Sequence, residues 1–378
     1  MTLIRSILND ISPMCNKVNI PQLLDEIVPT IIQANDKSYW MVRTDDGTNY
    51  LTFSENNIVA LNVRNVSIGH IQELYRQNAE KRQCVPLIKE YLMREHAAGH
   101  IRLSYDIGTQ GYSTNVGRLA GQIFSMAFEM HFGDIVLIPS HGASELKIGK
   151  ITDADLIIDD GLNAQFSIAR RVEWLKTISK RKLDPCLYKA LGAHQAISNI
   201  SDYSEYIERN YHSYFTIDDK MHYVLTVNNN TIGAANLSRC ILGILETAQE
   251  ISNVCGLDIN MDDVEFTINV NSPGKFSFIS TVKTSILVIA VATAIGGGTL
   301  HYQNLEMTTN GAFSTLVEGI NSLLDANENR REKQELFDGY MRSLELQSVE
   351  DWSSQLDEAE LEVIEDTIGV AENPVVEN

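Results

Sequence analysis

The chain has 378 residues, 44% of them hydrophobic, and a formal net charge of −20. This length provides for about two or three compact domains, each with its own core. The five cysteines are scattered without a C-x-x-C pair, which excludes a disulfide framework and a structural zinc site and favours a reduced, cytosolic setting.

The first part of the chain is predicted to pass from helix to strand. Apolar residues at helical spacing predict a helical segment over 1–35. Short β-rich runs follow at 39–44, 50–53 and 57–63, and an Asp-Gly turn at 45–47 between the first two predicts a β-hairpin. The remaining elements are predicted in this order: helices over 68–98 and 118–130, strands over 133–139, 145–151 and 222–229, a helix over 234–255 and a strand over 264–270.

Residues 284–305 form a run of 22 residues without Asp, Glu, Lys or Arg. A bilayer core of about 30 Å needs about 20 mostly apolar residues of helix, so the run predicts a transmembrane helix. A buried core helix or strand is the alternative, because each glycine at 296–298 weakens a helix by about 1 kcal/mol. Lys275 and Lys283 precede the run, which predicts a location in the cell inner membrane with the N-terminal domains in the cytoplasm.

The last 36 residues, 343–378, contain eleven Asp and Glu residues and no Lys or Arg. This composition is typical of a solvated, partly disordered tail. The functional alternative is a segment that competes within the molecule for a basic surface.

Four stretches follow one another in a recognisable order: SYWMVRTDDGTNYLTFSENNIVAL (38–61), AGQIFSMAFEMHFGDIVLIPS (120–140), LKIGKI (146–151) and ARRVEWLKTISKRKL (169–183). In these stretches, residues 36–200 resemble the N-terminal β-barrel module of Mrr-type restriction proteins, which is loosely similar to PUA- and EVE-like barrels. The resemblance implies a small β-barrel that senses a nucleotide or nucleic acid.

The predicted fold class is therefore α+β. Its regions are a helical N-terminal segment (1–35), the restriction-type β-barrel module (36–200), a small α+β domain (205–275), one transmembrane segment (276–305), an amphipathic helix with a linker (306–342) and an acidic tail (343–378).

The barrel module contains aromatic rings on which a flat base could stack and guanidinium groups suited to phosphate or base edges. The alternative is that the tryptophans belong to the core and the cations to a solvated surface. The predicted ligand-binding residues are Trp40, Arg43, Ser140, Arg170, Arg171, Trp174 and Lys180.

Asp134, Glu145 and Lys147 mimic the Asp…Glu-x-Lys metal triad of restriction nucleases. The resemblance places them instead on the turn and hairpin of the barrel. The sequence also contains no P-loop and no G-x-S-x-G elbow, so the chain is predicted not to be an enzyme and to use no cofactor and no metal.

Two stretches follow, VNSPGKFSFISTVKTSILVIAVATAIGGGTL (270–300) and TTNGAFSTLVEGINSLLD (308–325). Together they are similar to the single-span tail of bacterial effector proteins. The whole outline is similar to the channel effector of a nucleotidyltransferase-controlled defence system such as Hailong. The resemblance implies a homo-oligomer in the bacterial inner membrane that a partner nucleotidyltransferase, or a nucleotide or oligonucleotide ligand, controls. The predicted membrane and pore residues are Lys283, Ile286, Ile289, Thr293, Gly296 and Gly297.

Two functions are therefore expected from different classes. The first is a membrane effector of a prokaryotic antiphage system, whose cytosolic sensor controls oligomeric membrane disruption or channel opening. The second is a soluble nucleic-acid-binding adaptor of a restriction-like system, without catalysis of its own, in which the apolar run is buried core.

Overall fold

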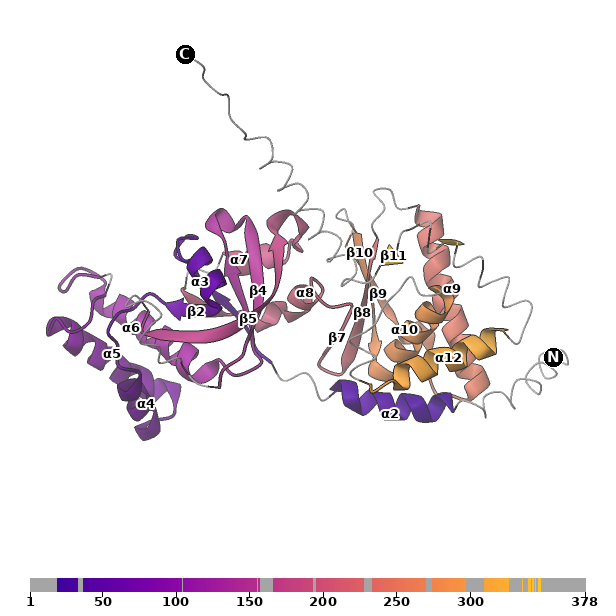
Figure 1. Cartoon of the computed structure of the whole chain (residues 1–378), viewed down its shortest axis with the longest axis horizontal. Coiled ribbons are helices and arrows are strands. Elements are labelled where there is room, and N and C mark those ends of the chain that lie inside the picture. Colours follow the sequence, from indigo (N-terminus) through magenta and orange to yellow (C-terminus); the bar gives the residue numbers. More distant parts are fainter. Residues whose placement is uncertain are drawn as a thin grey trace, which may run out of the picture. The chain divides into compact units, whose positions relative to one another are not determined.

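A computed structural model describes residues 19–32, 37–103, 105–154, 156, 166–192, 195–227, 233–269, 274–296 and 309–325, with 335, 339, 340, 342, 344, 346 and 347 (Figure 1). The chain divides into two compact units. Lys37–Ile207 forms one unit, and Met1–Asp36 together with Glu208–Asn378 forms the other. Both units combine helices with a β-sheet, which confirms the predicted α+β class.

The unit Lys37–Ile207 contains a six-stranded sheet in the order β2-β5-β4-β3-β1-β6. Strands β1 and β3 are parallel, and the other pairs are antiparallel. Among the described residues no ladder joins the end strands β2 and β6, so closure into the predicted barrel is not seen there. The strands are β1 Tyr39–Val42, β2 Ile58–Leu61, β3 Ile135–Pro139, β4 Glu145–Ile151, β5 Ile168–Ser179 and β6 Ile197–Asn199.

Both faces of this sheet are buried, and helices α3 to α6 pack on one of them. Trp40, Val136 and Ile138 point to this face and share a buried cluster with side chains of α3 to α6, such as Phe53 and Ile88. The helices are α3 Tyr50–Asn56, α4 Ile68–Gln77, α5 Lys81–Ala97, α6 Tyr112–Phe124, α7 Leu187–Leu191 and α8 Ser204–Glu208, with a π-helical turn at Ser125–Glu129 and 3-10 turns at His141–Ala143, Lys180–Lys182 and Ser201–Tyr203.

The hairpin predicted over 39–53 is wrong, because residues 50–53 begin helix α3. Asp45, Asp46 and Gly47 all have positive φ, so the chain leaves β1 in a left-handed turn. A Cβ atom on Gly47 would lie 2.4 Å from the backbone nitrogen of His141, so the close approach requires glycine. The turn thus directs the chain into a helix, and β1 pairs with β3 and β6.

The second unit contains an antiparallel sheet in the order β11-β8-β10-β9, with β7 also paired to β8. Its helices pack on one face, where Tyr223 of β8 and Phe276 and Phe278 of β10 enter a single core cluster. The elements are α2 Ile20–Ile32, β7 Tyr214–Ile217, β8 Lys220–Val227, α9 Ala234–Cys255, a 3-10 turn at Met261–Asp263, β9 Glu265–Asn269, β10 Gly274–Thr281, α10 Val282–Gly296, α12 Ala312–Asp325 and β11 Leu346–Gln347.

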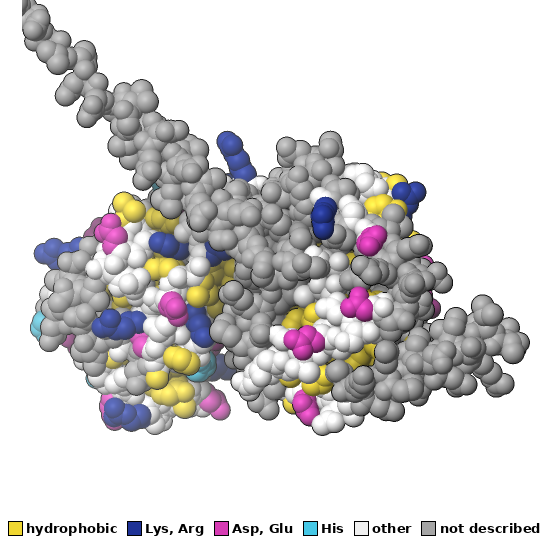
Figure 2. Space-filling view, turned by 45° about the vertical axis from the view of Figure 1, so that its right-hand side comes forward, with side chains coloured by type: hydrophobic (Ala, Val, Ile, Leu, Met, Phe, Trp, Pro, Cys, Tyr) yellow, Lys and Arg dark blue, Asp and Glu magenta, His cyan; other side chains and the backbone are white. Residues whose placement is uncertain are grey.

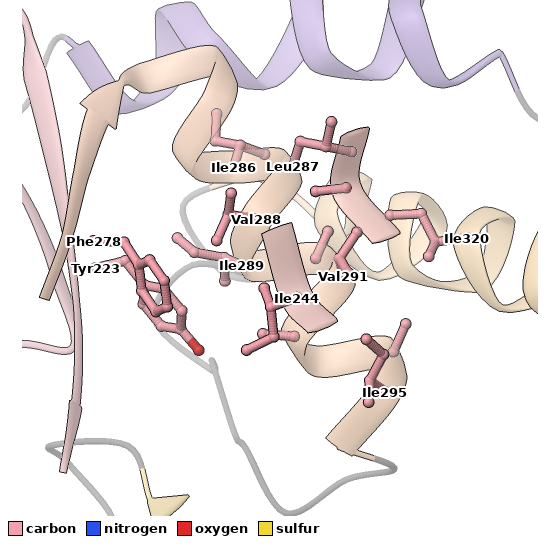
Figure 3. Close-up of a cluster of buried hydrophobic side chains, with 14 of the residues drawn as sticks. Tyr223, Ile244, Phe278, Ile286, Leu287, Val288, Ile289, Val291, Ile295 and Ile320 are labelled. Atoms are coloured by element: carbon pink, nitrogen blue, oxygen red, sulfur yellow. The ribbon is translucent and has the colours of Figure 1, made fainter. Parts of the chain in front are cut away.

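Helix α10 contains residues 284–296 of the apolar run and lies inside this core (Figure 3). Ile286 and Ile289 have no exposed surface, and Ile295 is 3% exposed. The helix contacts α2, α9, α12 and strands β8 and β10, so protein surrounds it on all sides. Its 15 residues extend over about 22 Å, which is shorter than a bilayer core of about 30 Å.

The prediction of a transmembrane segment over 276–305 is therefore wrong for the part that the structure describes. Residues 276–281 belong to strand β10, and 282–296 form the buried helix α10. Within the described residues, no helix combines the length and the apolar character needed to cross a bilayer.

The predicted pore residues have other roles, because their side chains are used within the unit. Ile286 and Ile289 are core residues, and Gly296 is buried at the end of α10. Lys283 forms an ion pair of 2.7 Å with Asp25 of α2, and the Thr293 hydroxyl donates to the Ile289 carbonyl oxygen. Gly297 lies outside the described residues.

The amphipathic helix predicted within 306–342 is α12, and its apolar face contributes Phe313, Leu316 and Ile320 to the same core. Of the predicted acidic tail, Leu344, Leu346 and Gln347 are described and the rest lies outside the described residues, as do 1–18 and 33–35 of the predicted N-terminal helical segment.

Candidate functional site

Trp40 is a core residue rather than a stacking platform. Its side chain is 4% exposed, and its indole Nε1 donates a hydrogen bond of 2.9 Å to Asp134 Oδ2. Asp134 also accepts from the backbone N–H groups of Ser38 and His131, at 2.9 and 3.0 Å. The ligand-binding role predicted for Trp40 is therefore wrong, because burial removes both faces of the ring from any ligand.

Arg170 is also structural. It is 1% exposed, and its guanidinium donates to the carbonyl oxygens of Met126 and Met130 at the end of the π-helical turn. Asp153 lies 3.5 Å from its Nη1. The arginine thus satisfies carbonyl groups that a helix end leaves without partners, and its predicted ligand-binding role is wrong.

Arg43 and Ser140 stabilise loops. Arg43 Nη2 donates to the Leu191 carbonyl oxygen at the end of α7, at 2.6 Å. Ser140 Oγ accepts from the Glu145 backbone N–H at 2.8 Å and thereby holds the turn between β3 and β4. Neither arrangement points to a ligand.

Three predicted residues remain near the surface, all from β5 or its end. Arg171 and Lys180 are exposed, and Trp174 is half-buried. Arg171 and Lys180 are nine residues apart along an extended strand, or about 30 Å, so they cannot belong to one small site. The candidate site is therefore built around the end of β5 that carries Trp174 and Lys180.

The ladder between β4 and β5 places Trp174 beside Lys147. Trp174 pairs with Gly149 and Thr177 with Lys147. A Cβ on Gly149 would lie 2.6 Å from the Trp174 ring, so only glycine allows the indole to lie across β4. The Lys147 ammonium lies 5.5 Å from the centre of that ring, a distance typical of a cation–π contact.

Helix α3 contributes two further side chains to this place. The side chains of Thr177 and Glu145 lie near the Tyr50 hydroxyl and influence its pKa. Ser54 lies one helical turn after Tyr50 and therefore on the same side of α3. We call Tyr50, Ser54, Glu145, Lys147, Trp174 and Thr177 the Lys147–Trp174 cluster.

Two polar atoms of the cluster have unused hydrogen-bonding capacity. Trp174 Nε1 and Ser54 Oγ are buried, and neither finds a hydrogen-bond partner in the described part of the chain. A buried polar group without a partner costs about 1–3 kcal/mol, so these atoms favour a ligand or water that completes their bonds.

Burial also governs the protonation of the cluster. It lowers the pKa of the Lys147 ammonium, while the Glu145 carboxylate acts in the opposite direction. Burial, followed by the charge of Glu145, raises the pKa of Tyr50 to about 12. Tyr50 therefore stays a neutral hydrogen-bonding group at physiological pH.

A basic and aromatic surface adjoins the cluster. Lys180 follows Thr177 by three residues, about 10 Å, and its ammonium lies 5.9 Å from the centre of the Tyr188 ring. The Tyr188 hydroxyl donates to the Lys180 carbonyl oxygen at 3.0 Å, and its side chain is 42% exposed. Arg181 and Lys189 are exposed nearby in sequence. We call these four residues the Lys180–Tyr188 edge.

Charge distribution distinguishes the two units. Residues 37–207 contain 19 Lys and Arg against 19 Asp and Glu, so the whole net charge of −20 belongs to the other unit. Figure 2 shows basic, acidic and hydrophobic side chains interspersed on the visible face of Lys37–Ile207, the neutral unit.

The nuclease triad does not assemble. Asp134 lies beside Ile151, since the Ile151 N–H donates to the Asp134 carbonyl oxygen, whereas Glu145 begins β4 at the opposite end. Six strand residues separate the two carboxylates by about 20 Å, too far for one metal ion. In the part of the chain that the structure describes, no three His, Cys, Asp or Glu side chains are grouped so that they could hold a metal.

Comparison with models of protein families, with curated proteins and with solved structures found no match for this chain. The site is therefore interpreted from its own geometry. Two residues of the candidate site were not predicted from the sequence. Tyr50 was missed because its segment has the pattern of a strand. Tyr188 was missed although its position after a Lys/Arg-rich run could have indicated it.

Proposed function

We propose that the unit Lys37–Ile207 binds single-stranded nucleic acid through the Lys147–Trp174 cluster and the Lys180–Tyr188 edge. The observation that carries the proposal is the indole of Trp174, which lies under the Lys147 ammonium with its N–H buried and unpaired in the described residues. An exposed basic and aromatic surface begins at Lys180, six residues after Trp174 and directly after the end of β5.

Each part has a role suited to a nucleic acid strand. Lys180, Arg181 and Lys189 attract phosphate groups, and the Tyr188 ring offers a face on which a base can stack. At the cluster, Lys147 Nζ donates to acceptors of a base, while Glu145 accepts from an exocyclic amino group. Single strands suit this arrangement because their base edges are exposed.

Because of the resemblance to restriction-type barrels, we propose that this unit is the recognition part of a prokaryotic antiphage system. The predicted partner nucleotidyltransferase and homo-oligomer stay predictions. The expectation of a membrane channel is not carried forward, because the described part of its apolar segment is core of the second unit.

The test is fluorescence anisotropy of the full chain with a labelled single-stranded oligonucleotide of about 20 nucleotides. We expect an affinity that falls with salt, and a loss of about tenfold or more in the double variant Lys180→Glu/Arg181→Glu. Tyr188→Ala should cost about fivefold or more, as the loss of one stacked base does.

The matched control is Arg82→Glu, which reverses an exposed cation on α5 of the same unit. It should change the affinity by less than about twofold, because one distant charge is screened by salt. An absence of salt-dependent binding, or equal losses in the double variant and in Arg82→Glu, would overturn the proposal.

A further inference from the structure

Two arginines lie opposite each other where the chain leaves β2 and approaches α4. Arg64 and Arg102 form an isolated antiparallel bridge, although helices α4 and α5 lie between them in the chain. Residues directly opposite in such a pair have Cβ atoms about 4.5–5.5 Å apart, on the same side of the two segments. The bridge therefore places two long cationic side chains next to each other.

The backbone on both sides of this bridge is fixed by buried neighbours. Val63 and Ile101, which precede the two arginines, are each 2% exposed and belong to the core of the neutral unit. Because successive side chains of an extended segment point to opposite sides, Arg64 and Arg102 point to solvent, and both are exposed. Asn65 ends the extended segment in a left-handed conformation, with φ of 61°.

The charge of the pair is not balanced within the described part of the chain. Neither arginine forms an ion pair or a side-chain hydrogen bond with a described residue. Glu95 lies close by, since its carbonyl oxygen accepts from the Ile101 N–H, but its Oε1 already binds Arg94 and its Oε2 binds His100, at 3.1 and 2.8 Å.

This arrangement has an energetic cost unless an anion joins it. Like charges directly opposite each other destabilise a pair of extended segments. A negatively charged group between the two guanidinium groups converts this repulsion into attraction. The bridge thus favours an anion from outside the described part of the chain.

Phosphate is the anion that suits two adjacent arginines best. Each guanidinium is a planar fork that binds two oxygens of a phosphate or carboxylate at once and keeps its charge at physiological pH. A carboxylate has two oxygens and is satisfied by one fork, whereas a terminal phosphate has three and can engage both. Tyr105 follows Arg102 by three residues and is 37% exposed, so an aromatic ring is also available at this loop.

The arginine pair is separate from the Lys147–Trp174 cluster and the Lys180–Tyr188 edge. It follows the end of β2, where Leu61 pairs with Ile168 at the start of β5. Lys180 comes after the other end of β5, twelve residues from Ile168, which corresponds to about 40 Å of extended strand. One small ligand cannot contact both places.

We propose that Arg64 and Arg102 together bind a phosphate group. Two sources carry this chemistry, a free phosphorylated molecule such as a nucleotide and the backbone of a nucleic acid. The proposal does not rest on the function proposed above, because neither arginine belongs to the cluster or to the edge.

The test is modification of the arginines of the full chain by phenylglyoxal, followed residue by residue with mass spectrometry. The first probe is inorganic pyrophosphate at about 10 mM, which would fill about nine-tenths of a site with a Kd of about 1 mM. We expect the modification of Arg64 and Arg102 to slow by about fivefold or more, relative to sodium chloride of equal ionic strength.

Arg82 of α5 is the matched control, because it is exposed and forms no ion pair with a described residue, yet no second arginine is bridged to it. Its rate should change by less than about twofold, since pyrophosphate and chloride of equal ionic strength screen a single charge alike. A single-stranded oligonucleotide of about 20 nucleotides is the second probe. Protection by pyrophosphate would assign the site to free phosphate groups, and protection by the oligonucleotide alone would assign it to backbone phosphates.

A double variant separates a bound phosphate from general screening. Pyrophosphate should raise the midpoint of thermal unfolding of the unmodified chain and of Arg82→Gln, because a ligand stabilises the fold that binds it. This rise should be lost in Arg64→Gln/Arg102→Gln. Absence of protection by both probes, equal protection of Arg82, or an unchanged rise in the double variant would each overturn the proposal. Failure of the oligonucleotide to bind at the Lys180–Tyr188 edge would leave the pyrophosphate results unaffected, so the two proposals fail separately.

Discussion

The Trp40 indole N–H donates a 2.9 Å hydrogen bond to Asp134 Oδ2, which joins the first strand of the neutral unit to the turn before β3. The bond uses the indole N–H of one predicted ligand-binding residue and a carboxylate oxygen of Asp134, which resembles part of a nuclease triad only in the sequence. Both side chains therefore contribute to the stability of the sheet.

Asp134→Ala should therefore destabilise the protein. Asp134 accepts three hydrogen bonds, two of them from backbone N–H groups, and bonds to charged groups contribute about 1.5–3 kcal/mol each. We expect a loss of about 3 kcal/mol or more in the free energy of unfolding, measured with urea. An unchanged stability with loss of a magnesium-dependent cleavage would instead support the nuclease triad.

Arg170 and Arg171 form a matched pair of neighbours with opposite environments. Arg170→Met should cost about 3–5 kcal/mol, because it leaves buried carbonyl oxygens and Asp153 without their partner. Arg171→Met should stay within about 0.5 kcal/mol, since its exposed side chain leaves the backbone bond to Asp153 intact. The measurement is the free energy of chemical unfolding of both variants. Similar losses of stability would contradict the assignment of Arg170 as buried and Arg171 as exposed.

A substitution in helix α10 tests whether this helix is buried in the protein core or lies in a membrane. Ile289→Ala should lower the free energy of unfolding by about 3 kcal/mol, because it opens a cavity among fully buried side chains. Leu242→Ala on α9 is the control, since Leu242 is 55% exposed and its change should stay within about 0.5 kcal/mol. Equal, small effects at both positions would mean that α10 is not in the core in solution.

His222 predicts a pH dependence of stability. Burial, then the charges of Arg209 and Lys220, lower its pKa to about 4, against a weaker opposite effect of Glu265. Between pH 4 and 6.5 the unfolded chain binds more protons at this residue than the folded chain, so stability rises with pH across this window. The contribution is complete above about 6.5 and is lost as the pH falls towards 4.

The comparison is between the unmodified chain and His222→Gln, unfolded at pH 7 and at about pH 4.5. The variant should lose less stability on acidification than the unmodified chain. Titration of the carboxylates destabilises both proteins, whereas titration of His222 destabilises only the unmodified chain. Identical losses would show that His222 does not titrate in this window.

Much of the fold could be predicted where the local pattern and the tertiary contacts agree. The periodic run over 234–255 is helix α9, and 145–151 is strand β4 paired with β3, because their apolar spacing matches the faces that the core covers. The run over 284–296 could not be assigned in this way. A helix that is apolar on all sides has the same sequence whether protein or lipid surrounds it.

The candidate site was less predictable, since residue type does not determine exposure. Arg170 and Arg171 are chemically identical, yet only the strand alternation and the π-helical turn decide which of them is buried. The partnership of Trp174 with Lys147 depends on the register of β4 and β5 and on the absence of a side chain at Gly149. None of these relations is local in the sequence.

The pairing of Asp25 with Lys283 joins residues 258 positions apart, with the whole neutral unit between them. During synthesis, α2 leaves the ribosome long before α10 and α12, against which it packs. At about 5–20 residues per second, its apolar face waits roughly 10–50 s for these partners. The inserted unit can complete its own fold in that interval, so the nascent chain has a transiently uncovered N-terminal helix that is a natural client for a chaperone.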